Sequence, residues 1–332
     1  MRKETLIWVL VDERPGTGKQ ALAVAESLKL PFVVKKMTWL CWANLPSQLS
    51  QLSKLSINKE SRERLCPPWP EMIISSGRRA AAIALNIKKK NAPNCKLVQI
   101  MDPGAFAHKN FSLIAIPKHD KLLEAKPNIL RIIGAPSFID DKEIINAKIH
   151  WKEKFGSLRR PIFALFIGGP TKRRPFSVNH ARELGELVSE LVKNNNGQLI
   201  ITTSPRTGKI LKYVLDSFKE RGIDPAYVYD CGISALDKKN PYFGFLSYAD
   251  DFIVTGESTS MCSELCSLSK PTYIFAPTGF LAPKHQRFVN SLIKNNYAGL
   301  LGDMTENKTM DKFRRRLNTT RSIIDRISKF IN

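Results

Sequence analysis

The feature that most constrains the fold is an alternation of short apolar segments with amphipathic helical segments along most of the chain. Its clearest unit runs from Asp250 to Pro277, with an apolar strand at 252–254, a polar turn at Gly256 and a second apolar strand at 273–275. A helical pattern lies between these two strands. Strands joined through a helix pair in parallel, and apolar strands between amphipathic helices indicate a sheet covered on both faces.

The same alternation predicts two domains. Apolar strands are expected at 6–11, 32–35, 72–75, 97–100, 113–116 and 129–132, and again at 162–167, 199–202 and 227–229 before the unit above. The polar segment from Asp140 to Arg160 separates the two series. We therefore expect an α/β protein with two Rossmann-like, doubly wound domains, 1–150 and 151–308, that face each other across a cleft. The amphipathic stretch from Met310 to Ile331 predicts one long C-terminal helix, at 309–332, that packs back toward the first domain.

Composition excludes several classes of protein. Hydrophobic residues make up 43% of the chain, which is enough for sizeable cores. No apolar run approaches the roughly 20 residues that span a bilayer. The six cysteines are scattered, which favours free thiols in a reducing compartment, and Cys262 and Cys266 lack the further ligands of a metal site. We expect a cytoplasmic protein, or one peripheral to the inner face of the membrane.

The formal charge of +22 implies an anionic partner. Nucleic acid, anionic lipid headgroups and phosphorylated compounds are the candidates, although abundant Lys, Asn and Ile also fit compositional drift in an AT-rich genome. The basic residues are dispersed, without a basic tail or a helix-turn-helix pattern. We therefore expect an anionic membrane surface or a phosphorylated ligand, and no specific nucleic acid.

The loops after the strands are the first place to look for a site, because open α/β sheets bind ligands at the carboxyl ends of their strands. The first loop, from Asp12 to Gln20, resembles a phosphate-binding loop but lacks its spacing and its Ser or Thr. It places Asp12 and Glu13 at a strand tip, where a carboxylate could act as general base on a hydroxyl. The alternative is a solvated turn.

Two further loops of the first half carry polar side chains. Arg78 and Arg79 follow Gly77 at the start of a helix, where cations oppose the helix dipole unless an anion binds there. Asp102 and His119 follow two neighbouring strands and are candidate acceptor-site or cleft residues. A lone histidine such as His119 is more often structural.

Three loops of the second half predict a diphosphate site. They are IGGPTKRR after the strand at 162–167, TTSPRTG after the strand at 199–202, and VTGESTSMCSE within the opening unit. Arg206 is suited to a bidentate contact with a diphosphate. Ser258, Thr259 and Ser260 could cap a helix or donate to the anion, and Glu264 could accept from sugar hydroxyls. A capped structural helix is the alternative for this last loop.

These motifs, taken in order with DERPG, SSGRRAAA, QIMDPG, PKHD and NPYFGFLSYADD, resemble the mitochondrial-fission ELM family from about Trp8 to Leu301. The family is similar in architecture to GT-B glycosyltransferases, whose C-terminal domain binds the nucleotide sugar and whose N-terminal domain binds the acceptor. The resemblance implies a donor site lined by Gly168, Gly169, Arg206, Thr207, Gly256, Ser258, Ser260, Met261 and Glu264. The chain departs from the family at Glu257, where Asp is frequent, and has one arginine fewer around Arg206.

The resulting hypothesis is a metal-independent glycosyltransferase with a nucleoside-diphosphate sugar as co-substrate, no other cofactor, and a lipid-linked or lipopolysaccharide-type acceptor. The alternative is a non-catalytic, membrane-peripheral adaptor of the mitochondrial-fission type. A sugar-nucleotide epimerase is a third possibility, weakened by the absence of a GxxGxxG loop and of a helical Tyr-x-x-x-Lys.

Overall fold

The chain forms two compact units, of which the computed structural model describes residues 5–12, 15–40, 56–120, 126–233, 239–304 and 315–331. The first unit comprises Met1–Phe138 together with Asn318–Asn332, and the second comprises Ile139–Leu317. The division therefore precedes the predicted boundary at residue 150. Residues 13–14, which include Glu13, and 41–55 lie outside the described residues.

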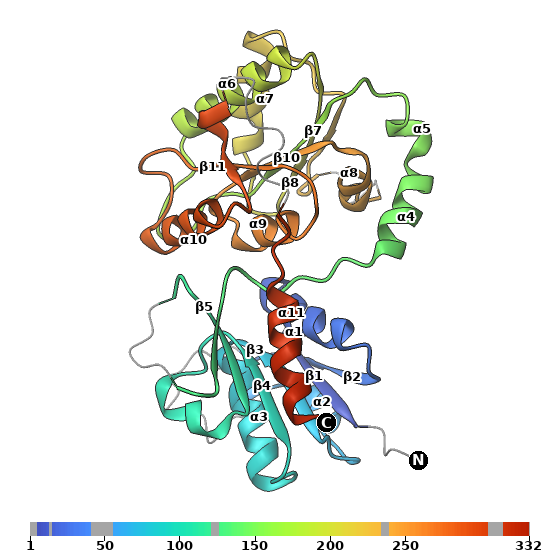
Figure 1. Ribbon diagram of the computed structural model, residues 1–332, viewed down its shortest axis with the longest axis vertical. Helices are drawn as coiled ribbons and strands as arrows, with labels where there is room; N and C mark the ends of the chain where they lie inside the picture. The colour runs from blue at the N-terminus through green and yellow to red at the C-terminus, as the bar shows by residue number, and fades with distance from the viewer. Residues whose placement is uncertain are drawn as a thin grey trace. The chain divides into compact units, whose positions relative to one another are not determined.

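The first unit is a six-stranded parallel sheet in the order β2-β1-β3-β4-β5-β6 (Figure 1). Its strands are β1 (Ile7–Asp12), β2 (Phe32–Met37), β3 (Met72–Ser76), β4 (Lys96–Ile100), β5 (Leu113–Pro117) and β6 (Ile129–Ile132). Its helices are α1 (Pro15–Leu28), α2 (Lys59–Glu63), α3 (Gly77–Lys90), the 3₁₀ turn η3 (Ala105–Asn110), α11 (Thr319–Ile327) and the 3₁₀ turn η6 (Ser328–Phe330). Successive side chains of a strand point to opposite faces of the sheet, so alternate residues belong to two hydrophobic cores, one on each face. One core contains Ile73 and Ile83 of α3, and the other contains Ile74, Val24 of α1 and Ile323 of α11.

The C-terminal helix is shorter than the sequence pattern predicts. Among the described residues it begins at Thr319, and residues 315–318 are not helical. The physical reason is that the Leu317 N–H donates to the Cys266 carbonyl (2.7 Å), which holds this stretch in the second unit. Immediately afterwards α11 packs beside α1 in the first unit (Figure 1), where the Thr320 hydroxyl donates to the Ser137 carbonyl (2.7 Å) and Ile327 is buried.

Helix α1 also differs from its prediction, which placed residues 12–20 in a loop. The helix begins at Pro15, so the Gly16-Thr17-Gly18 segment forms its first turn. Proline suits the first turn of a helix because its missing N–H would be unpaired there. Gly18 allows α1 to approach β1, since a Cβ at this position would lie 2.7 Å from Val11 Cγ1.

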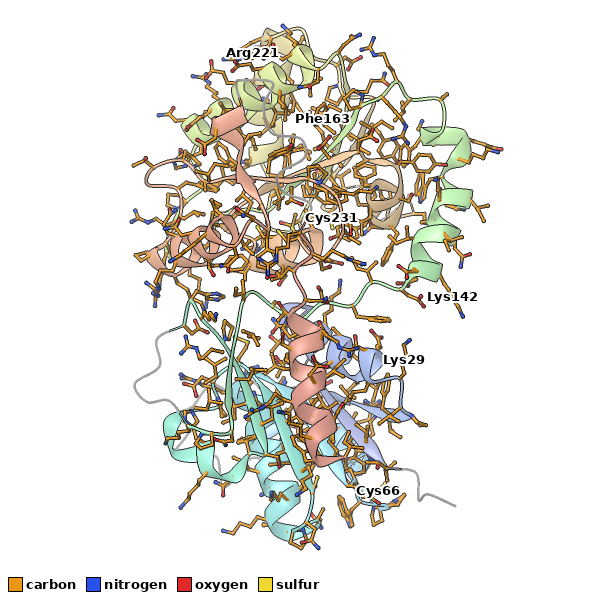
Figure 2. The ribbon with its side chains drawn as sticks, viewed as in Figure 1. Lys29, Cys66, Lys142, Phe163, Arg221 and Cys231 are labelled. Atoms are coloured by element: carbon orange, nitrogen blue, oxygen red, sulfur yellow. The ribbon has the colours of Figure 1, made fainter. Side chains whose placement is uncertain are left out.

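The second unit is another six-stranded parallel sheet, in the order β12-β11-β10-β7-β8-β9. Its strands are β7 (Ile162–Ile167), β8 (Gln198–Thr203), β9 (Tyr227–Tyr229), β10 (Asp251–Thr255), β11 (Thr272–Phe275) and β12 (Gly299–Leu300). Its helices are α4 (Asp141–His150), α5 (Lys152–Phe155), α6 (Val178–Asn194), α7 (Ile210–Glu220), α8 (Tyr242–Tyr248), α9 (Thr259–Leu265), α10 (Pro283–Lys294) and the 3₁₀ turn η5 (Leu301–Met304). Phe163, the second residue of β7 and labelled in Figure 2, is fully buried.

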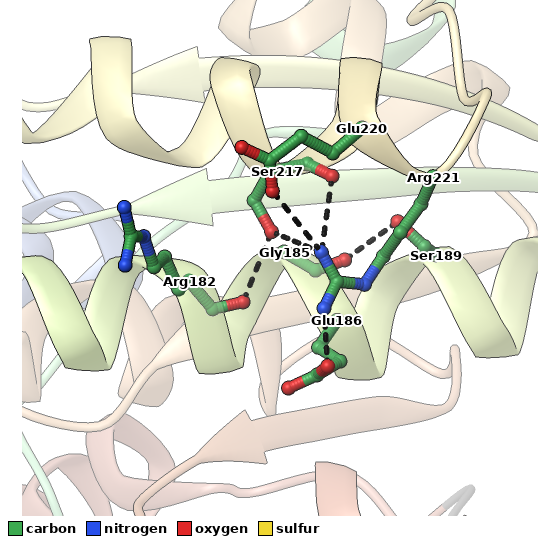
Figure 3. A network of polar contacts seen from close by, with 7 residues as sticks. All are labelled: Arg182, Gly185, Glu186, Ser189, Ser217, Glu220 and Arg221. Carbon is green, nitrogen blue, oxygen red and sulfur yellow. Dashed lines mark hydrogen bonds and ion pairs between the residues drawn. The ribbon is translucent and has the colours of Figure 1, made fainter.

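Helices α6 and α7 pack closely through a small residue. A Cβ at Gly185 would lie 2.4 Å from Ser217 Oγ, so only glycine permits this approach. Across the contact the Ser217 hydroxyl donates to the Arg182 carbonyl (3.1 Å), and Arg221 donates to Ser217 Oγ (3.1 Å) and pairs with Glu186 (Figure 3). These contacts lie on the outer helices, away from the carboxyl edge of the sheet.

The predicted fold class, α/β with two Rossmann-like doubly wound sheets, is confirmed. The polar segment 140–160, where the domain boundary was predicted, contains α4 and α5, which begin the second unit. The hydroxyl of Tyr248 in α8 donates to the Lys148 carbonyl of α4 (2.7 Å), which holds α4 against α8. Of the helices in the described parts of the chain, none has the length and apolar character required to cross a bilayer.

Candidate functional site

Each sheet has a topological switch point. In the second unit the chain continues from β7 to β8 and β9 on one side, and then places β10, β11 and β12 on the other side of β7. Loops that leave β7 and β10 therefore diverge, which opens the crevice where α/β sheets bind ligands. In the first unit the equivalent point lies between β1 and β3.

Two hydrogen bonds join the ends of β7 and β10 at the second unit's switch point. The Gly168 N–H donates to Thr255 Oγ1 (2.8 Å), and the Gly169 N–H donates to Glu257 Oε1 (2.7 Å). The Thr255 hydroxyl in turn donates to Glu257 Oε1 (3.1 Å). A Cβ at Gly168 would lie 1.8 Å from Glu257 Oε1, and a Cβ at Gly169 would lie 2.4 Å from the Arg206 carbonyl oxygen. Gly168 therefore permits the approach of Glu257, and Gly169 that of the loop after β8.

Glu257 is a buried carboxylate with one oxygen still available. The residue is only 5% exposed, and its Oε2 has no hydrogen-bond partner among the described residues. Burial raises the pKa of the Glu257 carboxyl, although the hydrogen bonds from Gly169 and Thr255 and the charge of Arg206 act in the opposite direction. A buried, unpaired acceptor is costly, and such groups concentrate at functional sites.

The loop after β8 closes the same edge. The Ser204 hydroxyl donates to the Gly168 carbonyl (2.9 Å), and Thr207 Oγ1 contacts the carbonyls of Ile167 (3.0 Å) and Gly168. Thr207 is 2% exposed, so its hydroxyl fastens the two loops together and is not presented to a ligand. Arg206, in contrast, is exposed, and its Nη1 lies 3.5 Å from the Pro170 carbonyl. Arg206 is thus a cation of this edge that a ligand can reach.

The predicted donor residues after β10 lie on or beside a short helix. Ser258 is the N-cap of α9, yet its side chain makes no capping hydrogen bond, and α9 has seven residues. Ser258 and Gly256 are buried, Met261 is half-buried and Ser260 is exposed. Glu264 is half-buried, and together with burial its carboxylate raises the pKa of the neighbouring Tyr242 hydroxyl well above its ordinary value. A helix this short has a weak dipole, so cationic side chains such as Arg206 must supply attraction for an anion.

His285 belongs to this edge and is missing from the sequence-based list. It lies in the first turn of α10, after Pro283, and its Nδ1 is buried without a partner in the described parts of the chain. Burial, Lys284 and Arg206 lower the pKa of the His285 imidazole, which places the ring in the electric field of Arg206. The sequence could have indicated His285, because it is a histidine in the first turn of the helix that follows the buried strand β11.

The predicted residues of the first unit divide into exposed and buried groups. Asp12, at the end of β1, is 8% exposed and His119 is 6% exposed, and both interact with neighbouring groups. Arg79 lies over the Trp39 ring, with 5.6 Å from Cζ to the centroid. Arg78 is exposed. Glu13 lies outside the described residues.

Arg78 and Asp102 are brought together at the ends of β3 and β4, with a residue that sequence reasoning missed. His108 Nε2 lies 2.7 Å from Asp102 Oδ1, and the Gly104 N–H donates to the same oxygen (2.9 Å). Burial would raise the pKa of the Asp102 carboxyl, but the hydrogen bonds from His108 and Gly104 and the charge of Arg78 hold it below its ordinary value. Asp102 is therefore an ionised group at this edge.

Two doubly wound parallel sheets in series, with polar loops at their switch points, define a GT-B-like protein. The chain belongs to the mitochondrial fission ELM1 family, because residues 15–329 match the sequence pattern of that family. The predicted family is thereby confirmed.

Two relatives support this assignment. The uncharacterised protein RP120 of Rickettsia prowazekii is 30% identical over 328 residues, which cover 90% of both chains. Mitochondrial fission protein ELM1 of Arabidopsis thaliana is 28% identical over 227 residues, which cover 62% of this chain and 51% of the plant protein.

Among solved structures the fold is similar to that of UDP-GlcNAc 2-epimerase from Methanocaldococcus jannaschii. The TM-score is 0.56 at 13% identity, over 98% of this chain and 99% of the other. A structure of the same enzyme in complex with UDP-GlcNAc and UDP has a TM-score of 0.51 at 12% identity, over 98% of this chain and 99% of the other. Identities this low show the fold alone. An epimerase has this fold. The absence of the GxxGxxG and Tyr-x-x-x-Lys patterns therefore does not separate a glycosyltransferase from an epimerase.

Proposed function

We propose that this chain is a GT-B-type glycosyltransferase that binds a nucleoside-diphosphate sugar at the carboxyl edge of its second unit. The sugar moves to a hydroxyl of a lipid-linked or lipopolysaccharide-type acceptor at a membrane surface. The proposal rests on Glu257, a buried carboxylate at the switch point with one oxygen that has no partner among the described residues. Burial raises the pKa of this carboxyl, and the charge of Arg206 acts on it in the opposite direction.

The chemistry assigns a task to each group at this edge. Arg206 would bind the diphosphate and stabilise the negative charge that develops as the diphosphate leaves. His285, neutral beside Arg206 in the free protein, would donate to the same phosphates. The open oxygen of Glu257 would accept from an N–H or O–H of the nucleotide sugar. The epimerase of similar fold is known in complex with UDP-GlcNAc and UDP, which makes these compounds the first to try.

Transfer also requires a base for the acceptor. In the proposed step Asp12 takes the acceptor's proton, the acceptor oxygen bonds to the anomeric carbon, and the bond from that carbon to the diphosphate breaks. The diphosphate departs with the bonding electrons. No metal is needed for this balance if Arg206 neutralises the leaving group.

The charge of the chain suits the proposed acceptor. At +22 it would be drawn to an anionic leaflet, to which each well-placed Lys or Arg adds about 1 kcal/mol. The protein is therefore proposed to work at a membrane surface from the cytoplasmic side.

A non-catalytic adaptor is the second candidate, favoured by the 28% identity to a plant protein named for mitochondrial fission. The two functions differ in what they require of the second unit's edge. An adaptor needs no ligand at Arg206, whereas the transferase does. A thermal-shift screen of UDP, GDP, ADP and their common sugars, on the native protein and on Arg206→Gln, tests the difference. If no nucleotide stabilises the native protein and the variant works normally in cells, the transferase proposal fails.

A further inference from the structure

A second constellation of charged side chains lies in the first unit, at the ends of β3 and β4. It consists of Asp102, His108 and Arg78, all of which belong to the first unit. Asp102 and His108 form a hydrogen-bonded pair in which the carboxylate is the outer member. The Asp102 side chain is 31% exposed, and the His108 side chain is 5% exposed.

The loop that carries Asp102 has a defined and unusual shape. Met101 has φ +70° although it is not glycine, and Gly104 has φ +107°. The Met101 N–H is fixed by the Ala115 carbonyl of β5 (2.9 Å). A non-glycine residue in the left-handed region is strained and persists only where its surroundings hold it, most often at binding sites.

His108 is equally well held. Its carbonyl accepts from Asn128 Nδ2 (2.8 Å), which also donates to the Phe111 carbonyl (2.9 Å). The ring Nδ1 is buried and has no partner among the described residues. A buried N–H without an acceptor would be costly, which favours the tautomer whose proton is on Nε2 and points at Asp102.

The consequence is a carboxylate with one anchored and one open oxygen. Both internal donors, Gly104 N–H and His108 Nε2, meet at Oδ1. Oδ2 accepts no hydrogen bond from the described part of the protein. The last residues of β3 and β4 pair with each other, so Arg78 and Asp102 each lie two residues beyond neighbouring strand ends. Arg78 is exposed, and its charge acts on the Asp102 carboxylate. An oriented acceptor beside an Arg donor matches a hydroxyl-bearing ligand, whose O–H donates to the carboxylate while an adjacent oxygen accepts from Arg78.

We propose that Asp102 and Arg78 form a binding site for vicinal hydroxyl groups of a sugar or polyol, with His108 as the residue that positions Asp102. The assignment of that sugar or polyol to the acceptor rests on the proposed transferase function. The site itself does not, because it is built entirely from the first unit. Asp12 keeps its proposed task as base, and Asp102 holds the acceptor.

The full-length protein with ¹³C-labelled aspartate carboxyls provides the test. The probes are myo-inositol, methyl glucoside and N-acetylglucosamine in large excess, and Asp102→Asn assigns the resonance. The Asp102 signal is expected to move with at least one probe in the native protein and in Arg62→Gln, a control that removes an exposed arginine of the same unit. In Arg78→Gln the affinity for that probe should be about tenfold lower.

His108 is tested by two replacements, because His108→Leu alone does not separate the loss of the hydrogen bond from a loss of folding. His108→Leu should raise the pKa of Asp102 and weaken probe binding about tenfold, and His108→Gln, which can still donate an N–H, should restore both in part. His150→Leu, at an exposed histidine, is the matched control. If no probe moves the Asp102 signal, or if both His108 variants bind as the native protein does, the site is refuted. Nucleotide binding by Asp102→Asn, read by thermal shift, reports separately on the transferase proposal.

Discussion

Glu257 and Gly169 hold the ends of two neighbouring strands together through one hydrogen bond of 2.7 Å, from the glycine N–H to the carboxylate. The bond crosses the switch point of the second sheet, where β7 and β10 send their loops in different directions. The carboxylate that makes it is buried, and its second oxygen has no partner among the described residues. A group that costs stability where a ligand is expected is the strongest physical indication of function in this chain.

Glu257→Gln should change how stability depends on pH. The folded-state pKa of Glu257 is raised by burial, so between the unfolded pKa near 4.5 and the folded value the native state binds more protons. The contribution of Glu257 is therefore fully present at low pH and is lost as pH rises through the folded pKa. Each pKa unit corresponds to about 1.4 kcal/mol.

Thermal unfolding of the native protein and of Glu257→Gln across mildly acidic and neutral pH measures this effect. The native protein should lose stability relative to the variant as pH rises. A difference between the two proteins that stays constant with pH would contradict the assignment. Gln keeps an acceptor oxygen for Gly169, so the bridge between β7 and β10 survives in the variant.

Gly168→Ala should destabilise the second unit by about 1–3 kcal/mol, because the new methyl would lie 1.8 Å from Glu257 Oε1 and force that carboxylate aside. Gly302→Ala is the matched control, since a Cβ there meets nothing within 4 Å. Calorimetric unfolding of the two variants measures the difference. Equal stability of the two variants would show that the approach of Gly168 to Glu257 is not constrained.

The sequence predicted the strands well because apolar runs such as 162–167 are buried on both faces and stand out from their surroundings. It failed where tertiary contacts decide the outcome. Leu317 fits a helical stripe, but its N–H is held by Cys266, a residue far away along the chain. Pro15 and Gly18 look like loop residues, but packing against β1 makes them the first turn of α1.

The candidate site was predictable only in outline. The loops with Gly168 and Arg206 could be found because ligands bind at strand ends in this kind of sheet. Thr207 could not be told from a ligand contact, since only the structure shows its hydroxyl against the Ile167 carbonyl. His108 and His285 were missed because their importance depends on burial and on neighbours that spacing along the chain does not reveal.

Binding of a nucleoside diphosphate should weaken as pH rises through the range in which His285 titrates. In the free protein burial, Lys284 and Arg206 keep the His285 pKa low. A bound diphosphate offsets the two cations and raises that pKa, so binding takes up a proton. Calorimetric titrations of UDP at several pH values should show this dependence in the native protein and a flatter one in His285→Gln. The same pH dependence in both proteins would exclude His285 from the site.

The most direct test of the proposed function is the stabilisation of the protein by UDP and UDP-GlcNAc with and without Arg206. A nucleotide at 100 times its dissociation constant adds about 2.7 kcal/mol, which raises the melting temperature by several degrees. We predict this shift in the native protein and in Arg182→Gln, an exposed arginine of the same unit, and its loss in Arg206→Gln. A shift of equal size in Arg206→Gln, or none in the native protein with any of the screened nucleotides, would contradict a nucleotide-sugar site at this edge.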